Sequence, residues 1–255
     1  MSRVYGERKP LDYLKVKKFF DDRSAKIEET GRLSVTMYQS EEVAQLRDAH
    51  EKTVILPLLQ AGPSTRALDI GCGTGRWGMS LSDIVGSYLG VDFCQAYIDA
   101  GQAMFASKHL DPAKFVFQRL PANEVSAETL AFSPPFDLVI IAGLLAFLND
   151  DDVYSIFRAL PDIMSDDATI YLREPLATDQ RLTLLDFPSD QLAQDYNVIY
   201  RTDEEMQALF APLVGAGAEL ISNFSLYPPD MLSPATRSET SQRAYIFRRL
   251  RRRES

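Results

Sequence analysis

Short apolar runs and helix-spaced apolar positions alternate along the middle of the chain. Five runs are typical of strands and occupy residues 66–70, 87–92, 115–118, 136–142 and 168–172. Apolar positions recur at helical spacing between them, in 95–108 and 152–164. This alternation predicts βαβ units, and therefore a mostly parallel sheet that is covered by helices on both faces.

The two ends of the chain depart from this pattern. Residues 1–60 are polar and helical in pattern, which predicts a cover of helices ahead of the main domain at 61–255. In this cover, Ser40 is expected to cap a helix. Near the other end, Thr202 and Glu205 have the spacing of a capping box. Two late apolar runs, at 219–227 and 244–250, predict an antiparallel hairpin that closes one edge of the sheet.

Composition narrows the class of protein. The 255 residues are 45% hydrophobic and 25% charged, which is typical of a globular domain. A net charge of −9 argues against a nucleic-acid binder. No apolar run is long enough for a membrane helix, and no signal peptide is recognised. Cys72 and Cys94 are too few for a disulfide framework or a structural zinc site, so we expect a cytoplasmic protein without a metal. The basic residues 248–253 are expected to form a solvated tail or to bind an anion or a partner.

One segment carries most of the functional information. It reads Ala67-Leu68-Asp69-Ile70-Gly71-Cys72-Gly73-Thr74-Gly75-Arg76 and joins the first predicted strand to a helix. Glycines at such a turn allow a ligand to lie against the main chain. The segment lacks the Gly-Lys-Ser/Thr ending of a triphosphate loop. Asp69 precedes the glycines, where a carboxylate can meet a cationic ligand, whereas Cys72 is expected to be a small turn residue rather than a nucleophile.

Asp92 ends the second predicted strand and lies 17 residues beyond Gly75 (92 − 75). An acid in this position suits the two hydroxyls of a ribose. The alternative is that Asp92 only caps the following helix.

With these residues, the chain resembles the class I S-adenosylmethionine-dependent methyltransferases over about residues 40–250. The resemblance rests on the glycine segment, on Asp92 and on Phe136-Asp137-Leu138-Val139. It implies a Rossmann-like, doubly wound α/β fold with a seven-stranded sheet, and S-adenosylmethionine as the cofactor.

The resemblance also implies roles for individual residues. Gly71, Cys72, Gly73 and Gly75 would pass the amino-acid part of the cofactor, and Asp92 would bind the ribose while Phe93 packs on the adenine. Where relatives often have an acid near the adenine amine, this chain reads Gln118-Arg119-Leu120-Pro121-Ala122, so Leu120 and Pro121 would make apolar or backbone contacts. Ala142 and Gly143 would face the methionine part.

Candidate catalytic groups lie at the end of the fifth predicted strand, because ligands of open α/β sheets bind at the carboxyl ends of strands. Glu174 could act as a base or orient an amine, and Arg173 could pair with it or bind an acidic substrate. His50 is a further candidate base, whereas His109 is expected to be a loop residue. Some relatives, the protein α-N-terminal methyltransferases, have a histidine where this chain has Phe147, which argues against a protein N-terminus as the acceptor.

Residues 175–201 show no clear period and predict a lid over the acceptor. Candidate substrate contacts in it are Tyr196, Tyr200 and Arg201, and Tyr13 is expected to close over the site from the helical cover.

Together these observations predict a methyltransferase, monomeric or homodimeric, that acts on an oxygen or nitrogen of a small polar molecule. The alternatives are a protein or peptide methyltransferase, a cofactor-binding module without catalysis, and an NAD-dependent oxidoreductase, for which Asp69 would have no role.

Overall fold

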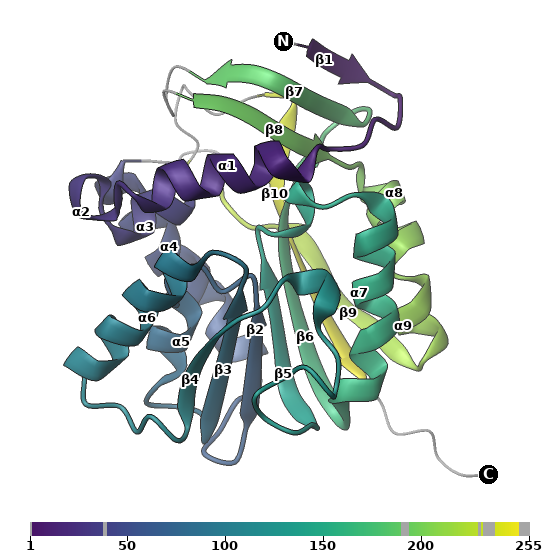
Figure 1. Cartoon of the computed structure of the whole chain (residues 1–255). Coiled ribbons are helices and arrows are strands. Elements are labelled where there is room, and N and C mark those ends of the chain that lie inside the picture. Colours follow the sequence, from purple (N-terminus) through teal and green to yellow (C-terminus); the bar gives the residue numbers. More distant parts are fainter. Residues whose placement is uncertain (1, 38–39, 190–193, 229–230, 232–237, 250–255) are drawn as a thin grey trace.

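The fold is centred on one seven-stranded sheet with the strand order β4-β3-β2-β5-β6-β10-β9 (Figure 1). The computed structural model describes residues 2–37, 40–189, 194–228, 231 and 238–249. Its strands are β2 (Arg66–Ile70), β3 (Ser87–Asp92), β4 (Phe115–Arg119), β5 (Phe136–Ala142), β6 (Met164–Ala177), β9 (Ala218–Ser225) and β10 (Thr240–Arg249). Strands β2 to β6 are parallel, and β10 lies antiparallel between β6 and β9. The predicted fold class, with its antiparallel C-terminal pair, is confirmed.

Helices cover both faces of this sheet. One face carries α4 (Glu41–Ile55), α5 (Arg76–Leu81) and α6 (Gln95–Ser107), and the other carries α7 (Asp150–Ile163), α8 (Asp203–Leu209) and α9 (Ala211–Gly215). Short 3-10 turns are η1 (Leu56–Leu58), η2 (Ala122–Glu124) and η3 (Leu145–Phe147). Ile55 and Trp77 anchor the first layer and Phe157 and Phe210 the second, so both faces of the strands are buried.

The helix caps follow the sequence. Thr202 accepts the N–H of Glu205, and the Glu205 carboxylate accepts the N–H of Thr202, so the predicted capping box is present. Ser40 accepts the N–H of Val43 at the start of α4. These contacts are local, which is why the sequence pattern predicts them.

A second, three-stranded antiparallel sheet corrects two expectations. It consists of β1 (Ser2–Tyr5), β7 (Leu182–Ser189) and β8 (Gln194–Tyr200) in the order β1-β7-β8. The N-terminal region therefore contains a strand, and the segment without a clear period is largely β-structure. The pattern misses β1 because its residues are mostly exposed and show no apolar run. It misses β7 because the pairing register shifts between Leu184 and Phe187.

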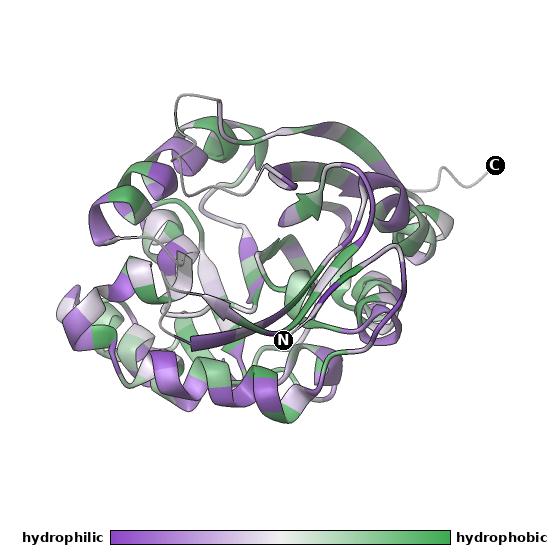
Figure 2. Ribbon diagram, turned by 90° about the horizontal axis from the view of Figure 1, so that it is seen from above, coloured by the Kyte–Doolittle hydropathy of each residue, from purple (hydrophilic) through white to green (hydrophobic). Residues whose placement is uncertain are grey.

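The N-terminal helices lie between the two sheets. They are α1 (Tyr13–Ser24), α2 (Ile27–Thr30) and α3 (Arg32–Met37). Val16 and Phe19 of α1 pack against Leu184 and Val198 of the small sheet. Seen from above, hydrophilic and hydrophobic residues alternate along the helices at the rim, as expected for helices that bury one side (Figure 2).

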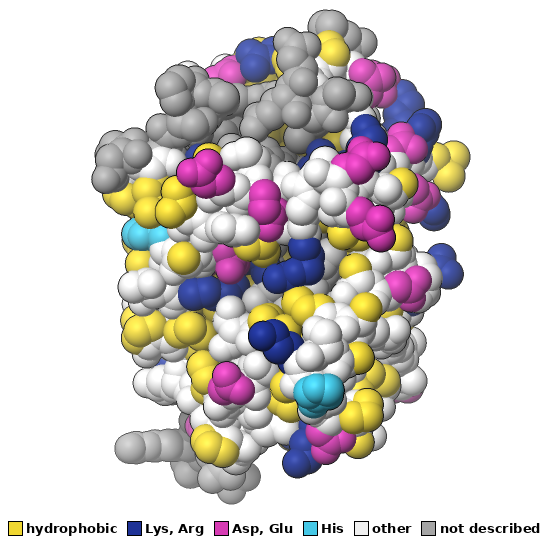
Figure 3. All heavy atoms as spheres, turned by 90° about the vertical axis from the view of Figure 1, so that its left-hand side faces the viewer, with side chains coloured by type: hydrophobic (Ala, Val, Ile, Leu, Met, Phe, Trp, Pro, Cys, Tyr) yellow, Lys and Arg dark blue, Asp and Glu magenta, His cyan; other side chains and the backbone are white. Residues whose placement is uncertain are grey.

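The surface carries charges of both signs. On the face that contains α3, α4 and α6, acidic and basic side chains are interspersed (Figure 3). Of the basic cluster at 248–253, Arg248 donates to Thr169 Oγ1 and Arg249 donates to the carbonyl oxygen of Pro161, so both are held by the fold. Residues 250–253 lie outside the described residues. Among the described helices, none combines the length and the apolar character that crossing a membrane requires.

Candidate active site

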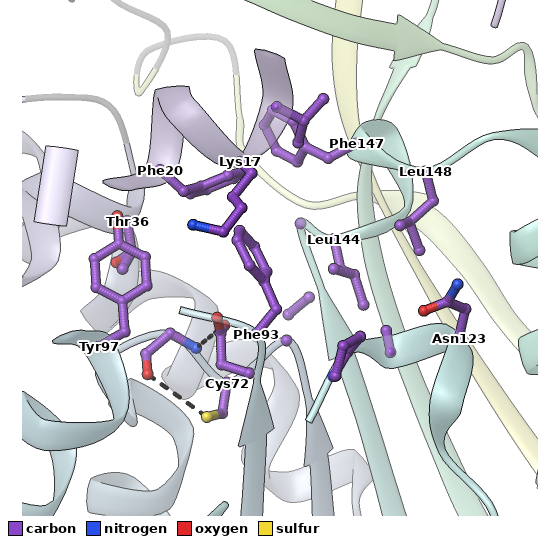
Figure 4. A pocket seen from close by; sticks show the side chains of 18 of the residues that line it. Lys17, Phe20, Thr36, Cys72, Phe93, Tyr97, Asn123, Leu144, Phe147 and Leu148 are labelled. Carbon is purple, nitrogen blue, oxygen red and sulfur yellow. Dashed lines mark hydrogen bonds between the residues drawn. The ribbon is translucent and has the colours of Figure 1, made fainter. Parts of the chain in front are cut away.

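A cavity of about 300 Å³ lies at the carboxyl ends of β2, β3 and β5, below α1 and α3 (Figure 4). Ligands of open α/β sheets bind at this position, and the volume is at the lower end of the range for ligand pockets. Its described lining residues come from every layer around it: Tyr13, Val16, Lys17, Phe20, Thr36, Gly71, Cys72, Gly73, Arg76, Asp92, Phe93, Tyr97, Pro121, Ala122, Asn123, Ala142, Gly143, Leu144, Phe147, Leu148 and Arg173.

The glycine loop forms the floor of this cavity. Gly73 has φ +54°, and a Cβ built on it would lie only 2.9 Å from Thr36 Cγ2 of α3. A side chain at Gly73 would therefore collide with the helix that covers the loop. Gly75 lies outside the cavity lining, and its conformation, φ +80°, starts α5 against the ring of Phe117. Both glycines are needed for close packing, but only Gly73 faces the cavity.

Asp92 projects from the end of β3 into the cavity. Its Oδ2 accepts the N–H of Gly73 and its Oδ1 accepts the N–H of Cys94, both at 2.9 Å. Each carboxylate oxygen has a further lone pair for a ligand hydroxyl. Burial raises the pKa of Asp92 to about 6. Because this value is still below 7, the carboxylate is mostly ionised at neutral pH and acts as an acceptor. This arrangement fits the ribose of S-adenosylmethionine.

Aromatic rings close the cavity from above. Phe20 of α1 makes edge-to-face contacts with Phe93, at a centroid distance of 5.5 Å, and with Phe147, at 4.9 Å. Figure 4 shows Phe20 and Lys17 extending from α1 toward Phe93. Tyr97 also lines the cavity. The lining is thus apolar around Phe93, as a site for a flat purine ring requires. The sequence interpretation missed Phe20, although its helical spacing with Val16 marked the buried side of α1.

Tyr13, expected to close over the site from the helical cover, lines the cavity. Its hydroxyl accepts the N–H of Asn149 at 2.8 Å and donates to Asp152. Burial and the bond to Asp152 raise its pKa to about 12. Tyr13 therefore stays neutral and ties α1 to the start of α7.

Several predicted cofactor residues do not reach the cavity. Asp69 is 2% exposed, accepts the hydroxyl of Tyr88 at 2.8 Å, and lies behind the glycine loop. Burial raises its pKa to about 6. Asp69 therefore lies below the cavity and is not one of its lining residues. Leu120 is likewise buried in the core, where its N–H donates to the Asp92 carbonyl oxygen.

Glu174 also lies outside the cavity lining, contrary to its expected place as a base. Its Oε1 accepts the N–H groups of Gly143, Leu144 and Leu145, and its Oε2 accepts that of Ala146. Burial raises its pKa, and the backbone donors partly oppose this shift. Glu174 therefore anchors the loop after β5 and has no oxygen directed at a ligand.

The second candidate base, His50, faces another direction. Its Nε2 lies 3.0 Å from the Leu226 carbonyl oxygen and its ring packs near Tyr227, away from the cavity lining. Leu226 lies 176 positions beyond His50 in the sequence, so the sequence pattern does not predict the direction of the His50 ring.

The predicted lid residues form a second layer. Arg201 is 1% exposed and donates to Asp150 and to the carbonyl oxygens of Leu145 and Leu148. Tyr196 packs on Phe19 at 5.4 Å, and its hydroxyl meets that of Tyr200 at 3.5 Å. None of the three lines the cavity, so they support its walls from behind.

A buried ionic cluster lies beside the floor of the cavity. Glu51 of α4 is fully buried and accepts two hydrogen bonds from Arg76 and one from the Tyr171 hydroxyl. Burial opposes its ionisation, but the charges of Arg76, Arg173 and Lys52 hold its pKa well below the usual range. Burial lowers the pKa of Lys52, which lies over the Trp77 ring, to about 7. The sequence did not reveal this cluster, because its members are far apart in the chain.

Comparison with known proteins gives the same class of fold. Residues 67–167 match the model of a methyltransferase domain. Phosphoethanolamine N-methyltransferase 1 of Haemonchus contortus, solved with phosphoethanolamine and S-adenosylhomocysteine, superposes with a TM-score of 0.69 at 18% identity. The match covers 96% of this chain and 51% of that one, so the chain spans about half the length of this enzyme.

Two other solved structures agree. An S-adenosylmethionine-dependent methyltransferase of Leishmania major gives a TM-score of 0.64 at 16% identity, covering 93% of this chain and 86% of that one. The [4+2]-cyclase SpnF gives 0.63 at 12%, covering 96% and 98%. A search of curated proteins gives no match. Residues 67–167 thus match a methyltransferase domain, and the chain has the Rossmann-like methyltransferase fold that the sequence predicts.

No group of three or more His, Cys, Asp or Glu side chains with the arrangement of a metal site occurs in the part of the chain that the structure describes. The residues present do fit S-adenosylmethionine: Asp92 suits the ribose, Phe93 and Pro121 suit the adenine, and the loop at Gly71 leaves the backbone open to the amino-acid part.

Proposed function

We propose that this protein transfers the methyl group of S-adenosylmethionine to an oxygen or nitrogen of a small polar acceptor. The observation that carries the proposal is the cavity that the buried Asp92 carboxylate, the glycine loop and Phe93 line together. A small acceptor suits a cavity that α1 covers and aromatic rings narrow. The free thiols of Cys72 and Cys94 are in keeping with a cytoplasmic location, which is part of the proposal.

The bound cofactor would supply a methyl group on a positively charged sulfur. The chain's own residues would then act by position: Asp92 holds the ribose hydroxyls, and the backbone at Gly71 and Gly73 fixes the amino-acid part. Phe20 and Phe147 exclude water from the cavity. In-line displacement gains much of its rate from such positioning.

Few of the described residues that line the cavity could remove a proton from the acceptor. Among the described lining residues the oxygen acids are Asp92, which is engaged by Gly73 and Cys94, and two tyrosines. The pKa of Tyr13 is about 12. Glu174 contributes by holding the loop that carries Leu144. We therefore propose that the acceptor is an amine or a hydroxyl that attacks the methyl group without a strong base from the protein.

Equilibrium binding of S-adenosylhomocysteine tests the cofactor part of this proposal. Asp92→Asn removes a charged acceptor and is expected to weaken binding about tenfold or more. Asp99→Asn changes an exposed acid on α6 and is the matched control, with unchanged affinity. Equal affinities of the Asp92 variant and the wild type would refute the ribose assignment. Screening small amines and hydroxyl compounds for methyl transfer then identifies the acceptor.

A further inference from the structure

Arg173 places a positive charge on the wall of the cavity. It follows Leu172 in β6, opposite Ala142 of β5 and Ala244 of β10. The residue is 9% exposed and lines the cavity beside Gly143, where an added Cβ would lie 3.2 Å from Arg173 Nη2. The guanidinium is therefore buried against protein on most sides and directed at the space above β5.

The hydrogen bonds of this guanidinium are weak and incomplete. Nη1 donates to Gln242 Oε1 at 3.2 Å, and Nη2 donates to the Ala142 carbonyl oxygen at 3.3 Å. The buried Nε has no hydrogen-bond partner among the described residues, and it forms a long ion pair with Glu51 Oε1 at 3.6 Å. That oxygen already accepts from Tyr171 and Arg76. Arg173 has five N–H donors, and its two hydrogen bonds go to neutral acceptors.

Three other buried arginines of this chain are paired much more closely with carboxylates. Arg76 contacts Asp48 and Glu51 at 2.9 and 2.8 Å, Arg181 contacts Asp150 and Glu205 at 3.0 and 3.1 Å, and Arg201 contacts Asp150 at 2.7 Å. Those side chains stabilise the fold. Arg173 differs from these three because, among the described residues, no carboxylate oxygen lies within hydrogen-bond distance of it, although it lines the cavity.

The carboxylates near Arg173 are shared with other donors. Burial lowers the pKa of Arg173, but the charge of Glu51 raises it above its ordinary value. Glu51 also accepts from Arg76 and Tyr171, and Glu174 accepts from four backbone N–H groups. An anion in the cavity would give the Arg173 Nη groups a charged acceptor in place of neutral ones, and the planar fork of arginine suits two oxygens of one group.

We propose that Arg173 binds an anionic oxygen group, a carboxylate or a phosphate, of the methyl acceptor. This rests on the proposed function, because it assigns the acceptor to the same cavity. The acceptor is then an acidic small molecule, whose charge would be held beside Gly143 while its nucleophilic atom points toward the bound cofactor.

Titration of the protein saturated with S-adenosylhomocysteine tests this assignment. Inorganic phosphate and acetate serve as probes for the two kinds of anion, and binding is followed by calorimetry or by the line width of the phosphate phosphorus signal. We expect at least one anion to bind the wild type, and Arg173→Gln to weaken it about tenfold or more. Arg173→Lys keeps the charge without the fork and should give an intermediate loss. Arg158→Gln, an exposed change on α7, should bind as the wild type does.

Binding of S-adenosylhomocysteine and of 5′-methylthioadenosine, which lacks the amino-acid part, separates the remaining outcomes. We expect Arg173→Gln to bind both as tightly as the wild type. A selective loss of S-adenosylhomocysteine would show that Arg173 holds the cofactor's own carboxylate, and would overturn the proposal. It would also be overturned if neither anion bound the wild type, or if both bound the Gln and Lys variants unchanged. Loss of cofactor binding by the wild type would instead refute the proposed function itself.

Discussion

Glu174 and Arg201 hold the same residue, Leu145, by its two backbone polar groups. The Glu174 carboxylate accepts the Leu145 N–H at 2.9 Å, and Arg201 donates to the Leu145 carbonyl oxygen at 2.7 Å. Glu174 comes from β6 of the main sheet, whereas Arg201 directly follows β8 of the small sheet. The loop between them carries Leu144, Phe147 and Leu148 into the cavity. The two sheets thus jointly fix one wall of the site.

Glu174→Gln should loosen this loop. An amide presents one acceptor oxygen where the carboxylate presents two, so at least one backbone N–H loses its partner. We expect the free energy of unfolding to fall by about 1–3 kcal/mol, measured by urea denaturation. Amide hydrogen exchange of Leu144, Leu145 and Ala146 should become faster. Glu219→Gln, an exposed change on β9, is the control, and unchanged exchange in the Glu174 variant would contradict the anchoring role.

Arg201→Met tests the other half of the clamp. The substitution keeps an apolar stem but removes the guanidinium donors of the Leu145 and Leu148 carbonyl oxygens, and Asp150 keeps Arg181 and Arg8 as its described ion-pair partners. Unfolding free energy should drop by about 2–4 kcal/mol in calorimetry or denaturation. Arg158→Met, with an exposed side chain on α7, should change it by about 0.5 kcal/mol or less. Equal stability of the two variants would mean that the clamp does not stabilise the protein.

Phe20→Ala should open the roof of the cavity. It removes ring contacts with Phe93, Tyr97 and Phe147. Since such contacts contribute about 0.5–1.5 kcal/mol each, S-adenosylhomocysteine should dissociate about tenfold faster in stopped-flow measurements. Leu14→Ala, on the exposed side of the same helix, should leave the rate unchanged. A dissociation rate that is equal in both variants would show that α1 does not cover the cofactor.

Cofactor affinity should depend on pH through Asp92. Burial raises its pKa to about 6, and the ionised form is the better acceptor for ribose hydroxyls. Affinity for S-adenosylhomocysteine should therefore be constant above about pH 7 and fall as the pH decreases through 6, by up to about tenfold per unit.

A second acid must be separated in this measurement, because the pKa of Asp69 is also about 6. Asp92→Asn should abolish the pH dependence, whereas Asp69→Asn should retain it, since Asp69 lies outside the cavity lining. If Asp69→Asn abolished the pH dependence and Asp92→Asn retained it, the ribose contact would belong to Asp69 and not to Asp92.

Local patterns explain which parts of the fold the sequence predicts. The strands of the main sheet contain short apolar runs, and the Thr202 capping box needs only neighbouring residues. The small sheet is different, because β1 is four residues long and pairs with a segment about 180 positions away. No periodicity within either strand reports such a pairing.

The same distinction holds for the site. The glycine loop and Asp92 are close in sequence and follow consecutive strands, so their meeting in one cavity is predictable. Phe20 reaches the cavity only because α1 packs under the small sheet. Glu174 occupies the expected end of β6, but its orientation depends on four backbone donors, which sequence patterns do not show.

Titration of the wild-type protein with S-adenosylmethionine in a calorimeter, and with NAD in parallel, tests the central claim most directly. The arrangement of Asp92, Gly73 and Phe93 predicts one saturable site for S-adenosylmethionine, competed by S-adenosylhomocysteine, and no binding of NAD. Absence of S-adenosylmethionine binding, or tighter binding of NAD at the same site, would contradict it.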